Sequence, residues 1–198
     1  MDRGLLAWGR AAFAREPGPP ARHLPPLWLF TDAQRLADPR GAAARLPRGK
    51  AGVVLRHDAD PGRAALGRDL ARICRARRLV LVVTGDVRLA AALGAGVHLR
   101  GGRWPGVQRR RRGMVTSSAH SLADLRRAWR AGAALAFLSP AFPTMSHPGA
   151  PALGPVRWAA LAGRAPVAAA ALGGIDATSV RRLPLRLCRA VGAIGALA

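Results

Sequence analysis

Short runs of hydrophobic residues recur along the chain, and the segments between them carry apolar residues at helical spacing. A run of about four to eight apolar residues bounded by polar residues or glycine is typical of a buried strand. Eight such runs predict strands at residues 27–30, 51–55, 79–83, 96–99, 113–117, 133–138, 166–170 and 188–194.

The segments that separate these runs predict helices. Thr31-Asp32 is a natural helix cap, and we expect the helix that follows it to reach about Leu46. Further helices are predicted at 61–77, 87–93, 121–131 and 155–162, with a short one after Asp176. Strands that alternate with helices in this way lie parallel, because each crossover helix covers one face of the sheet. Eight units predict an α/β fold, a closed (β/α)8 TIM barrel.

Composition divides the chain into two parts. Residues 1–16 have apolar residues at roughly helical spacing, and five prolines at 17–26 then indicate an extended linker. We therefore predict an N-terminal helix and proline-rich linker over residues 1–26, and a barrel over residues 27–198. Because little of the sequence follows the last predicted strand, the barrel would lack its eighth helix. We expect the N-terminal helix to pack in that position.

Composition and charge limit the classes of function. Half of the 198 residues are hydrophobic, which is enough for the core of one domain. The formal charge of +22 is typical of proteins that bind nucleic acid, but the basic residues are scattered apart from 109–112, and all except Lys50 are arginine. A GC-rich genome would produce the same excess of arginine. We therefore expect only non-specific binding of nucleic acid and keep a polyanion-binding protein as an alternative.

The cysteines and the hydropathy profile indicate a location. Cys74 and Cys188 lie far apart in apolar segments and match no metal or disulfide spacing, so we expect buried free thiols. No uninterrupted apolar run is long enough to cross a membrane, and arginines interrupt the first 15 residues, where a signal peptide would have its apolar core. These features predict a cytoplasmic protein with no membrane partner.

Six short motifs lie at the ends of predicted strands. They are L-W-L-F-T-D at 27–32, V-L-R at 54–56, G-A-G-V-H-L at 94–99, S-A-H-S-L at 118–122, S-P-A-F-P-T at 139–144 and A-L-G-G-I at 171–175. In residues and order they resemble the motifs of the thiamine-phosphate synthase and thiazole tautomerase (TenI-like) superfamily, over residues 27–198. The resemblance implies a barrel of thiamine biosynthesis that binds a thiazole phosphate at the carboxyl ends of its strands.

The resemblance also implies that the magnesium site of the synthase branch is lost. The positions of that branch's two metal-binding carboxylates hold Gly85 and Arg103 here, and neither residue can ligate the ion. Two pyrophosphate-binding lysines of the family are replaced by Asp58 and His147. We therefore predict no cofactor and no magnesium, and we favour the tautomerase branch over magnesium-dependent synthase activity.

The tautomerase branch matches the motif after the fifth predicted strand. The resemblance makes His120 the acid/base group that moves a proton on the thiazole, with Ser118 as a second polar contact. An imidazole suits this role because it can both accept and return a proton near neutral pH. The alternative is that His120 only caps the helix that begins at Ser121.

Phosphate-binding residues are predicted on three other segments. Gly173 and Gly174 follow a buried strand, where glycine lets an anion approach the exposed backbone N–H groups. The resemblance adds Thr144 and Ser146 as contacts for a phosphate or carboxylate. Arg56 can hold a phosphate through two hydrogen bonds.

Some alternatives stay open. The family's last strand ends in a serine that helps to bind phosphate, and Leu197 stands at that position here. A catalytically degenerate binding or regulatory homologue is therefore the main alternative to an enzyme. His98 lies inside a predicted strand, where we expect it to face the barrel interior rather than to act as a catalyst. The sequence also leaves a homodimer open.

Overall fold

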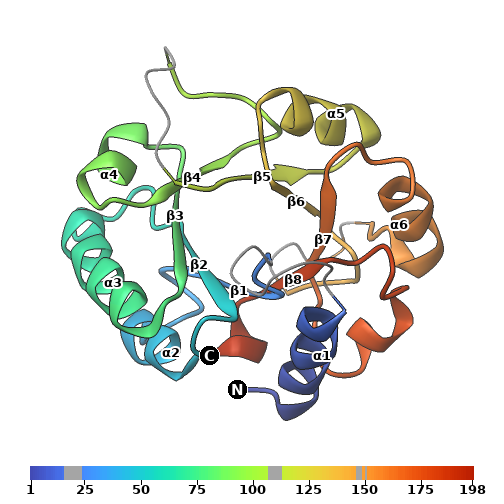
Figure 1. The fold of residues 1–198 in the computed structure, drawn as a ribbon, viewed down its shortest axis with the longest axis horizontal. Coiled ribbons are helices and arrows are strands. Elements are labelled where there is room, and N and C mark those ends of the chain that lie inside the picture. Colours follow the sequence, from blue (N-terminus) through green and yellow to red (C-terminus); the bar gives the residue numbers. More distant parts are fainter. Residues whose placement is uncertain (16–23, 107–112, 146–148, 150) are drawn as a thin grey trace.

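The structure is a computed structural model that describes residues 1–15, 24–106, 113–145, 149 and 151–198. Within these residues, eight parallel strands close into a barrel in which each strand pairs with the next and β8 pairs with β1 (Figure 1). The strands are β1 (Leu27–Phe30), β2 (Ala51–Leu55), β3 (Val80–Thr84), β4 (Gly96–Leu99), β5 (Val115–Ala119), β6 (Leu135–Leu138), β7 (Ala168–Leu172) and β8 (Ala190–Ala193). The predicted TIM barrel is confirmed.

Helices surround the barrel and cover the outer faces of its strands. They are α1 (Arg3–Ala14), α2 (Pro39–Arg45), α3 (Arg63–Arg77), α4 (Val87–Ala92), α5 (Leu122–Arg130), α6 (Gly154–Ala162) and the 3-10 helices η2 (Ser179–Arg182) and η3 (Gly195–Leu197). Leu66, Leu70 and Cys74 form the buried face of α3, at the spacing read from the sequence, and belong to one large hydrophobic cluster between strands and helices.

The interior of the barrel holds a second, smaller cluster of aromatic and aliphatic side chains. The rings of Phe30 and Phe137 meet edge to face with 4.9 Å between their centroids, and Trp28 meets Phe137 in the same manner at 5.7 Å. The Trp28 ring has room because Gly52 lies beside it on β2, where a Cβ atom would come within 2.4 Å of the ring. Gly52 therefore makes room for the Trp28 ring, and the interior of the barrel is filled by side chains.

His98 lies in this interior, as predicted. Its ring is buried and contacts Phe30 edge to face, with 5.6 Å between the ring centroids. Its Nδ1 atom lies 2.9 Å from the Thr116 hydroxyl. Burial lowers the pKa of His98 to about 3, and the positive charges of Arg56 and Arg100 act in the same direction. The side chain is neutral at ordinary pH and serves the packing of the barrel.

The first crossover differs from the prediction. We expected a helix directly after Asp32, but α2 begins only at Pro39. The Asp32 carboxylate accepts two backbone N–H groups and closes a separate turn. Asp38 then caps α2 by accepting the N–H of Gly41, and Pro39 takes the first helical position, where no N–H is needed. The prediction was wrong for residues 33–38.

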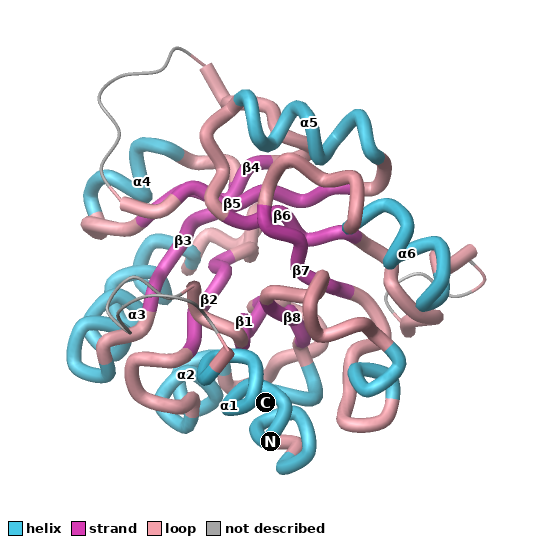
Figure 2. The backbone as a smooth tube through the Cα atoms, turned by 45° about the vertical axis from the view of Figure 1, so that its right-hand side comes forward, coloured by secondary structure: helices cyan, strands magenta, loops and turns pink. Residues whose placement is uncertain are grey.

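α1 lies against the outside of the barrel where β8 meets β1, with both ends of the chain beside it (Figure 1, Figure 2). Gly9 rests on Leu27 of β1, since a Cβ atom on Gly9 would lie 2.7 Å from Leu27 Cγ. The backbone N–H of Asp2 donates to the Ala196 carbonyl at 2.9 Å, and its carboxylate accepts the N–H of Ala177 at 2.8 Å. This is the position expected for α1 from the sequence. Residues 17–23, most of the predicted linker, lie outside the described residues, as does residue 16.

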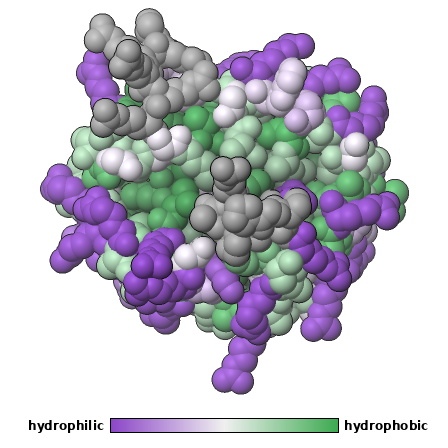
Figure 3. Space-filling model, in the orientation of Figure 1, coloured by the Kyte–Doolittle hydropathy of each residue, from purple (hydrophilic) through white to green (hydrophobic). Residues whose placement is uncertain are grey.

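The surface follows the scattered charge of the sequence. Hydrophilic side chains stand around the outline of the face in Figure 3, and hydrophobic residues show between them toward its middle. The arginine run at 109–112 lies outside the described residues. None of the described helices has the length and apolar character needed to cross a membrane.

Candidate functional site

A cavity of about 640 Å³ opens at the carboxyl ends of the strands and is lined mainly by the segments that follow β6, β7 and β8. Its volume lies in the range of small-molecule sites. The cavity brings together five of the predicted site residues, namely Arg56, His120, Thr144, Gly173 and Gly174. These residues follow four different strands, which is the arrangement that a TIM barrel uses to build a binding site.

The glycine pair forms a tight turn directly after β7. Both residues have positive φ, +93° for Gly173 and +62° for Gly174. A Cβ atom on Gly174 would lie 2.4 Å from the Pro143 carbonyl oxygen, and Phe142 N–H donates to the Gly173 carbonyl at 3.0 Å. Glycine is therefore required here by the close approach of the segment after β6. Gly174 and Ile175 line the cavity, and their N–H groups donate to no acceptor among the described residues.

The segment after β8 lines the same cavity and was missed in the sequence analysis. Gly192, Gly195 and Ala196 belong to its wall. The loops after the seventh and eighth strands commonly form the phosphate site of a TIM barrel. The two glycines, placed three residues apart around the end of β8, are the signal that could have found this wall. Leu197, at the position of the family's serine, is fully buried in the core.

His120 follows β5 and precedes Ser121, the cap of α5. Its Nδ1 atom lies 2.8 Å from the carbonyl oxygen of Ser139. Because a carbonyl can only accept, this contact favours the neutral tautomer with the proton on Nδ1 and the lone pair on Nε2; the Ser139 hydroxyl lies farther from Nδ1, at 3.4 Å. The helix is capped instead by the Ser121 hydroxyl, which accepts Asp124 N–H, while the His120 backbone N–H donates to the Asp124 carboxylate. The imidazole is thus not used for capping.

Of the two remaining predicted residues, the structure describes only one. Ser118 belongs to β5 and is not part of the cavity wall; its hydroxyl accepts the N–H of Gly101 at 3.1 Å and so holds the segment after β4. The hydroxyl of Ser117 does the same for Gly102 at 2.9 Å. Ser146 lies outside the described residues.

Charged side chains stand on both walls of the cavity. Arg35 and Arg56 contribute guanidinium groups from the segments after β1 and β2. Arg35 forms an ion pair with Asp32 at 2.6 Å, whereas Arg56 makes no ion pair with any described residue. Asp176 adds a carboxylate near the glycine turn, and hydrogen bonds from Ser179 hold the pKa of that carboxyl below its usual range. The cavity therefore combines cationic groups with free backbone donors, and one carboxylate lies at its edge.

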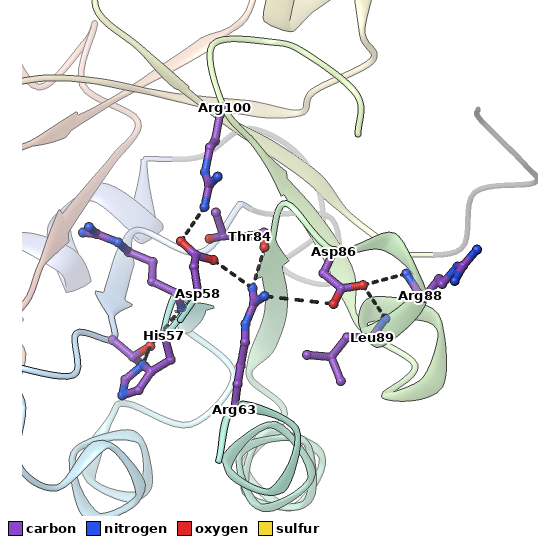
Figure 4. Close-up of polar contacts among 10 residues, drawn as sticks. His57, Asp58, Arg63, Thr84, Asp86, Arg88, Leu89 and Arg100 are labelled. Atoms are coloured by element: carbon purple, nitrogen blue, oxygen red, sulfur yellow. Dashed lines mark hydrogen bonds and ion pairs between the residues drawn. The ribbon is translucent and has the colours of Figure 1, made fainter. Parts of the chain in front are cut away.

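The opposite side of the barrel mouth, after β2, β3 and β4, is closed by ion pairs (Figure 4). Arg63 Nη2 lies 3.1 Å from Asp58 Oδ1 and Nη1 lies 4.0 Å from Asp86 Oδ2, while Arg100 pairs with the second oxygen of Asp58. Arg63 also donates to the Thr84 carbonyl at 2.5 Å. None of Asp58, Arg63, Asp86 and Arg100 lines the cavity. We refer to these four residues as the arginine cluster.

The residues on this side do not fit a magnesium ion. Gly85 offers no carboxylate, and a Cβ atom placed on it would lie only 3.7 Å from the Arg100 guanidinium carbon. The neighbouring Asp86 carboxylate accepts the N–H groups of Arg88 and Leu89 as the cap of α4. Arg103 is exposed. Magnesium prefers several oxygen ligands without adjacent cations, so the groups found here are unsuited to it. That the protein works without magnesium stays a prediction.

Fold and cavity together define a TIM barrel with a cavity at the carboxyl ends of its strands, where enzymes of this fold have their active sites. A sequence model described as thiamine monophosphate synthase matches residues 27–197. The chain therefore belongs to the thiamine-phosphate synthase/TenI superfamily, as the six motifs indicated.

Solved structures agree on the fold. Thiamine phosphate pyrophosphorylase from Pyrococcus furiosus superposes with a TM-score of 0.71 at 22% identity and covers 86% of each chain. The protein of the same name from Bacteroides thetaiotaomicron gives 0.56 at 16% identity, over 87% of this chain and 83% of its own. FabK from Thermotoga maritima gives 0.60 at 15% identity, over 87% of this chain and 58% of its own. No curated protein matches the chain significantly in sequence.

Proposed function

We propose that the protein binds a small phosphorylated thiazole in the cavity and moves a proton on it without a metal ion, in the manner of a thiazole tautomerase. The observation that carries the proposal is the position of His120 and the hydrogen bond of its Nδ1 atom. His120 lines the same cavity as Gly173 and Gly174, and its Nδ1–H donates to the Ser139 carbonyl, so that Nε2 is available as a base. Membership in the superfamily supports a ligand from thiamine biosynthesis.

The proposed reaction assigns one task to each wall. The free N–H groups of Gly174 and Ile175 bind the phosphate, and Arg56 binds an anionic group on the other side. Nε2 of His120 takes a proton from one carbon of the thiazole and returns it to another, so the reaction is an isomerisation with no net change in protons. While the ring is doubly protonated, the Ser139 carbonyl stabilises the imidazolium through Nδ1–H.

The test is incubation with thiazole carboxylate phosphate, with the isomerisation followed by NMR in D2O. His120→Ala should lower the rate by about 10² to 10⁴-fold, the usual contribution of a positioned acid/base group, and leave ligand binding nearly unchanged. Asp69→Asn, a change on the outside of α3, serves as the control. Equal rates for the wild-type protein and His120→Ala would eliminate the proposal.

A second candidate is a binding or regulatory homologue without catalysis. Two observations favour it: Leu197 is buried where the family has a phosphate-binding serine, and the Asp176 carboxylate lies beside the glycine turn. Both would weaken the hold on a phosphate. Binding of thiazole carboxylate phosphate with no isomerisation by the wild-type protein would select this candidate.

A further inference from the structure

The Asp58 carboxylate occupies a position between two arginines of the arginine cluster. Its Oδ1 faces Arg63 and its Oδ2 faces Arg100, so each oxygen pairs with a different guanidinium group (Figure 4). The two arginines come from separate elements, α3 and the segment after β4, and their guanidinium groups meet at Asp58, next to Thr84 at the end of β3. Two guanidinium groups that converge on one carboxylate form an oxyanion site.

Donors in this site exceed what Asp58 uses. Arg63 Nε and Thr84 Oγ1 are buried and have no hydrogen-bond partner among the described residues. Asp86 neutralises the Arg63 guanidinium only weakly, because its carboxylate lies 4.0 Å away and also caps α4. Buried polar groups without partners are uncommon, and here they lie at the same place as the paired arginines. Two polar groups next to the Asp58 ion pairs are therefore not used within the described part of the chain.

We propose that Asp58 is a built-in anion that fills this arginine site and thereby limits the protein to ligands with a single phosphate. A ligand whose second phosphate extends from the cavity toward β2–β4 meets two arginines that are already paired, and it meets the charge of Asp58 itself. The part of this inference that concerns the ligand rests on the proposed function. The assignment of Asp58 rests on the cluster alone.

Because Asp58 is part of the chain, its carboxylate competes effectively with free anions for the two arginines. Its side chain is 42% exposed, so each ion pair by itself is weak in water. However, a tethered group is present at an effective concentration of about millimolar or more. Free anions at lower concentration do not displace it, and removal of its charge leaves two arginines facing each other.

The experiment measures binding of inorganic phosphate and inorganic pyrophosphate by calorimetry without metal ions. The variant is Asp58→Asn. The control is Asp69→Asn, because Asp69 also lies between two arginines, Arg40 and Arg72, but on the outer surface of α3. We expect the wild-type protein and the control to bind the two anions within about threefold of each other. Asp58→Asn should bind pyrophosphate about tenfold or more tightly than the wild-type protein, since it removes a charge adjacent to the site.

Two further variants make the result specific. Adding Arg100→Gln to Asp58→Asn should remove the gain, because the gain requires both arginines. Asp58→Ser is read in the same way if Asp58→Asn fails to fold. Equal pyrophosphate affinities for Asp58→Asn and Asp69→Asn would overturn the inference, as would a wild-type protein that already prefers pyrophosphate by tenfold. If the wild-type protein binds no phosphate but Asp58→Asn gains pyrophosphate, the proposed function fails and the assignment of Asp58 stands.

Discussion

The two sides of the barrel mouth are built from equivalent strand ends, but they differ in whether their polar groups are paired within the protein. On the side of β5 to β8, a cavity is lined by the glycine turn after β7 and by His120, whose Nε2 has no hydrogen-bond partner among the described residues. On the side of β2 to β4, guanidinium groups converge as well, but Asp58 neutralises them from within the chain. The difference shows that the position of a residue at a strand end does not make a site. A site requires polar groups that the protein has left unpaired.

The largest expected effect on stability is that of replacing Gly174, and it is compared with the replacement of Gly85, which has a similar positive φ. Gly174 has φ of +62° and Gly85 has φ of +65°, one on each side of the mouth. A Cβ atom on Gly174 would lie 2.4 Å from the Pro143 carbonyl, whereas on Gly85 its nearest contact is 3.7 Å away, at Arg100. Gly174→Ala should lower the free energy of unfolding by about 3 kcal/mol, and Gly85→Ala by about 1 kcal/mol.

Urea denaturation measures both values, and phosphate binding provides a second readout. We expect Gly174→Ala to lose phosphate binding and Gly85→Ala to retain it. Equal destabilisation by the two substitutions would show that the turn after β7 is no more constrained than the turn after β3.

Removal of Arg63 should mainly lower the stability of the fold, whereas removal of Arg56 should mainly weaken phosphate binding. Arg63 is 13% exposed and donates to the Thr84 carbonyl and to Asp58, so Arg63→Ala should cost about 2 kcal/mol of stability. Arg56→Ala should change stability little and weaken phosphate binding about tenfold. Thermal denaturation and calorimetry distinguish the two. Arg72→Ala, which removes a 75% exposed ion-pair partner, is the control for loss of a surface arginine.

Acid should destabilise the interior that both sides share. The pKa of His98 is about 3 in the folded protein, below the value of about 6.5 expected when the chain is unfolded. Between these values the unfolded state binds the proton and the folded state does not, so stability falls as pH is lowered. The slope for this group approaches about 1.4 kcal/mol per pH unit.

The control for this prediction is His98→Gln, which keeps a polar partner for Thr116 and cannot titrate. Burial lowers the pKa of His57 as well, so the quantity to compare is the difference between the two proteins in urea denaturation from pH 7 to pH 4. Identical slopes would contradict the assignment of the acid sensitivity to His98.

The smallest effect is expected at the rim of the arginine cluster. Arg100 is 63% exposed, and its ion pair with Asp58 is therefore screened by water and salt. Arg100→Ala should change the free energy of unfolding by about 0.5 kcal/mol or less. A loss as large as that for Arg63→Ala would show that the cluster stabilises the fold rather than shaping the ligand site.

Most of the strands could be predicted because they are short apolar runs, whose composition indicates burial on both faces; β5, with the sequence VTSSA, is the exception. Their ends shifted by up to two residues, as for β5, predicted at 113–117 and observed at Val115–Ala119. The helix predicted after Asp32 was wrong because one aspartate closes a local turn and a second one, Asp38, starts the helix later. Asp38-Pro39 is a recognisable cap, so this error was avoidable.

The site was less accessible to sequence reasoning. The motifs led to His120 and to the glycine turn, and both line the cavity. The hydrogen bond from His120 to Ser139, which assigns the proton to Nδ1, joins two strand ends that are 19 residues apart. From the sequence, Asp58 could be recognised only as an acidic residue at the position of a family lysine. Its ion pair with Arg100 could not be predicted, because the two residues are 42 positions apart and the pairing depends on how two loops meet.

The contacts of Asp2 have a consequence for the order in which the molecule folds. Its carboxylate holds Ala177, 175 residues away, and its backbone N–H holds Ala196. These are the segments that carry the walls after β7 and β8, and β8 itself must pair with β1. Closing so long a loop is slow and follows the local contacts. We therefore expect the cavity to be completed late in folding, when the two ends of the chain come together, and a ligand that binds it to slow unfolding.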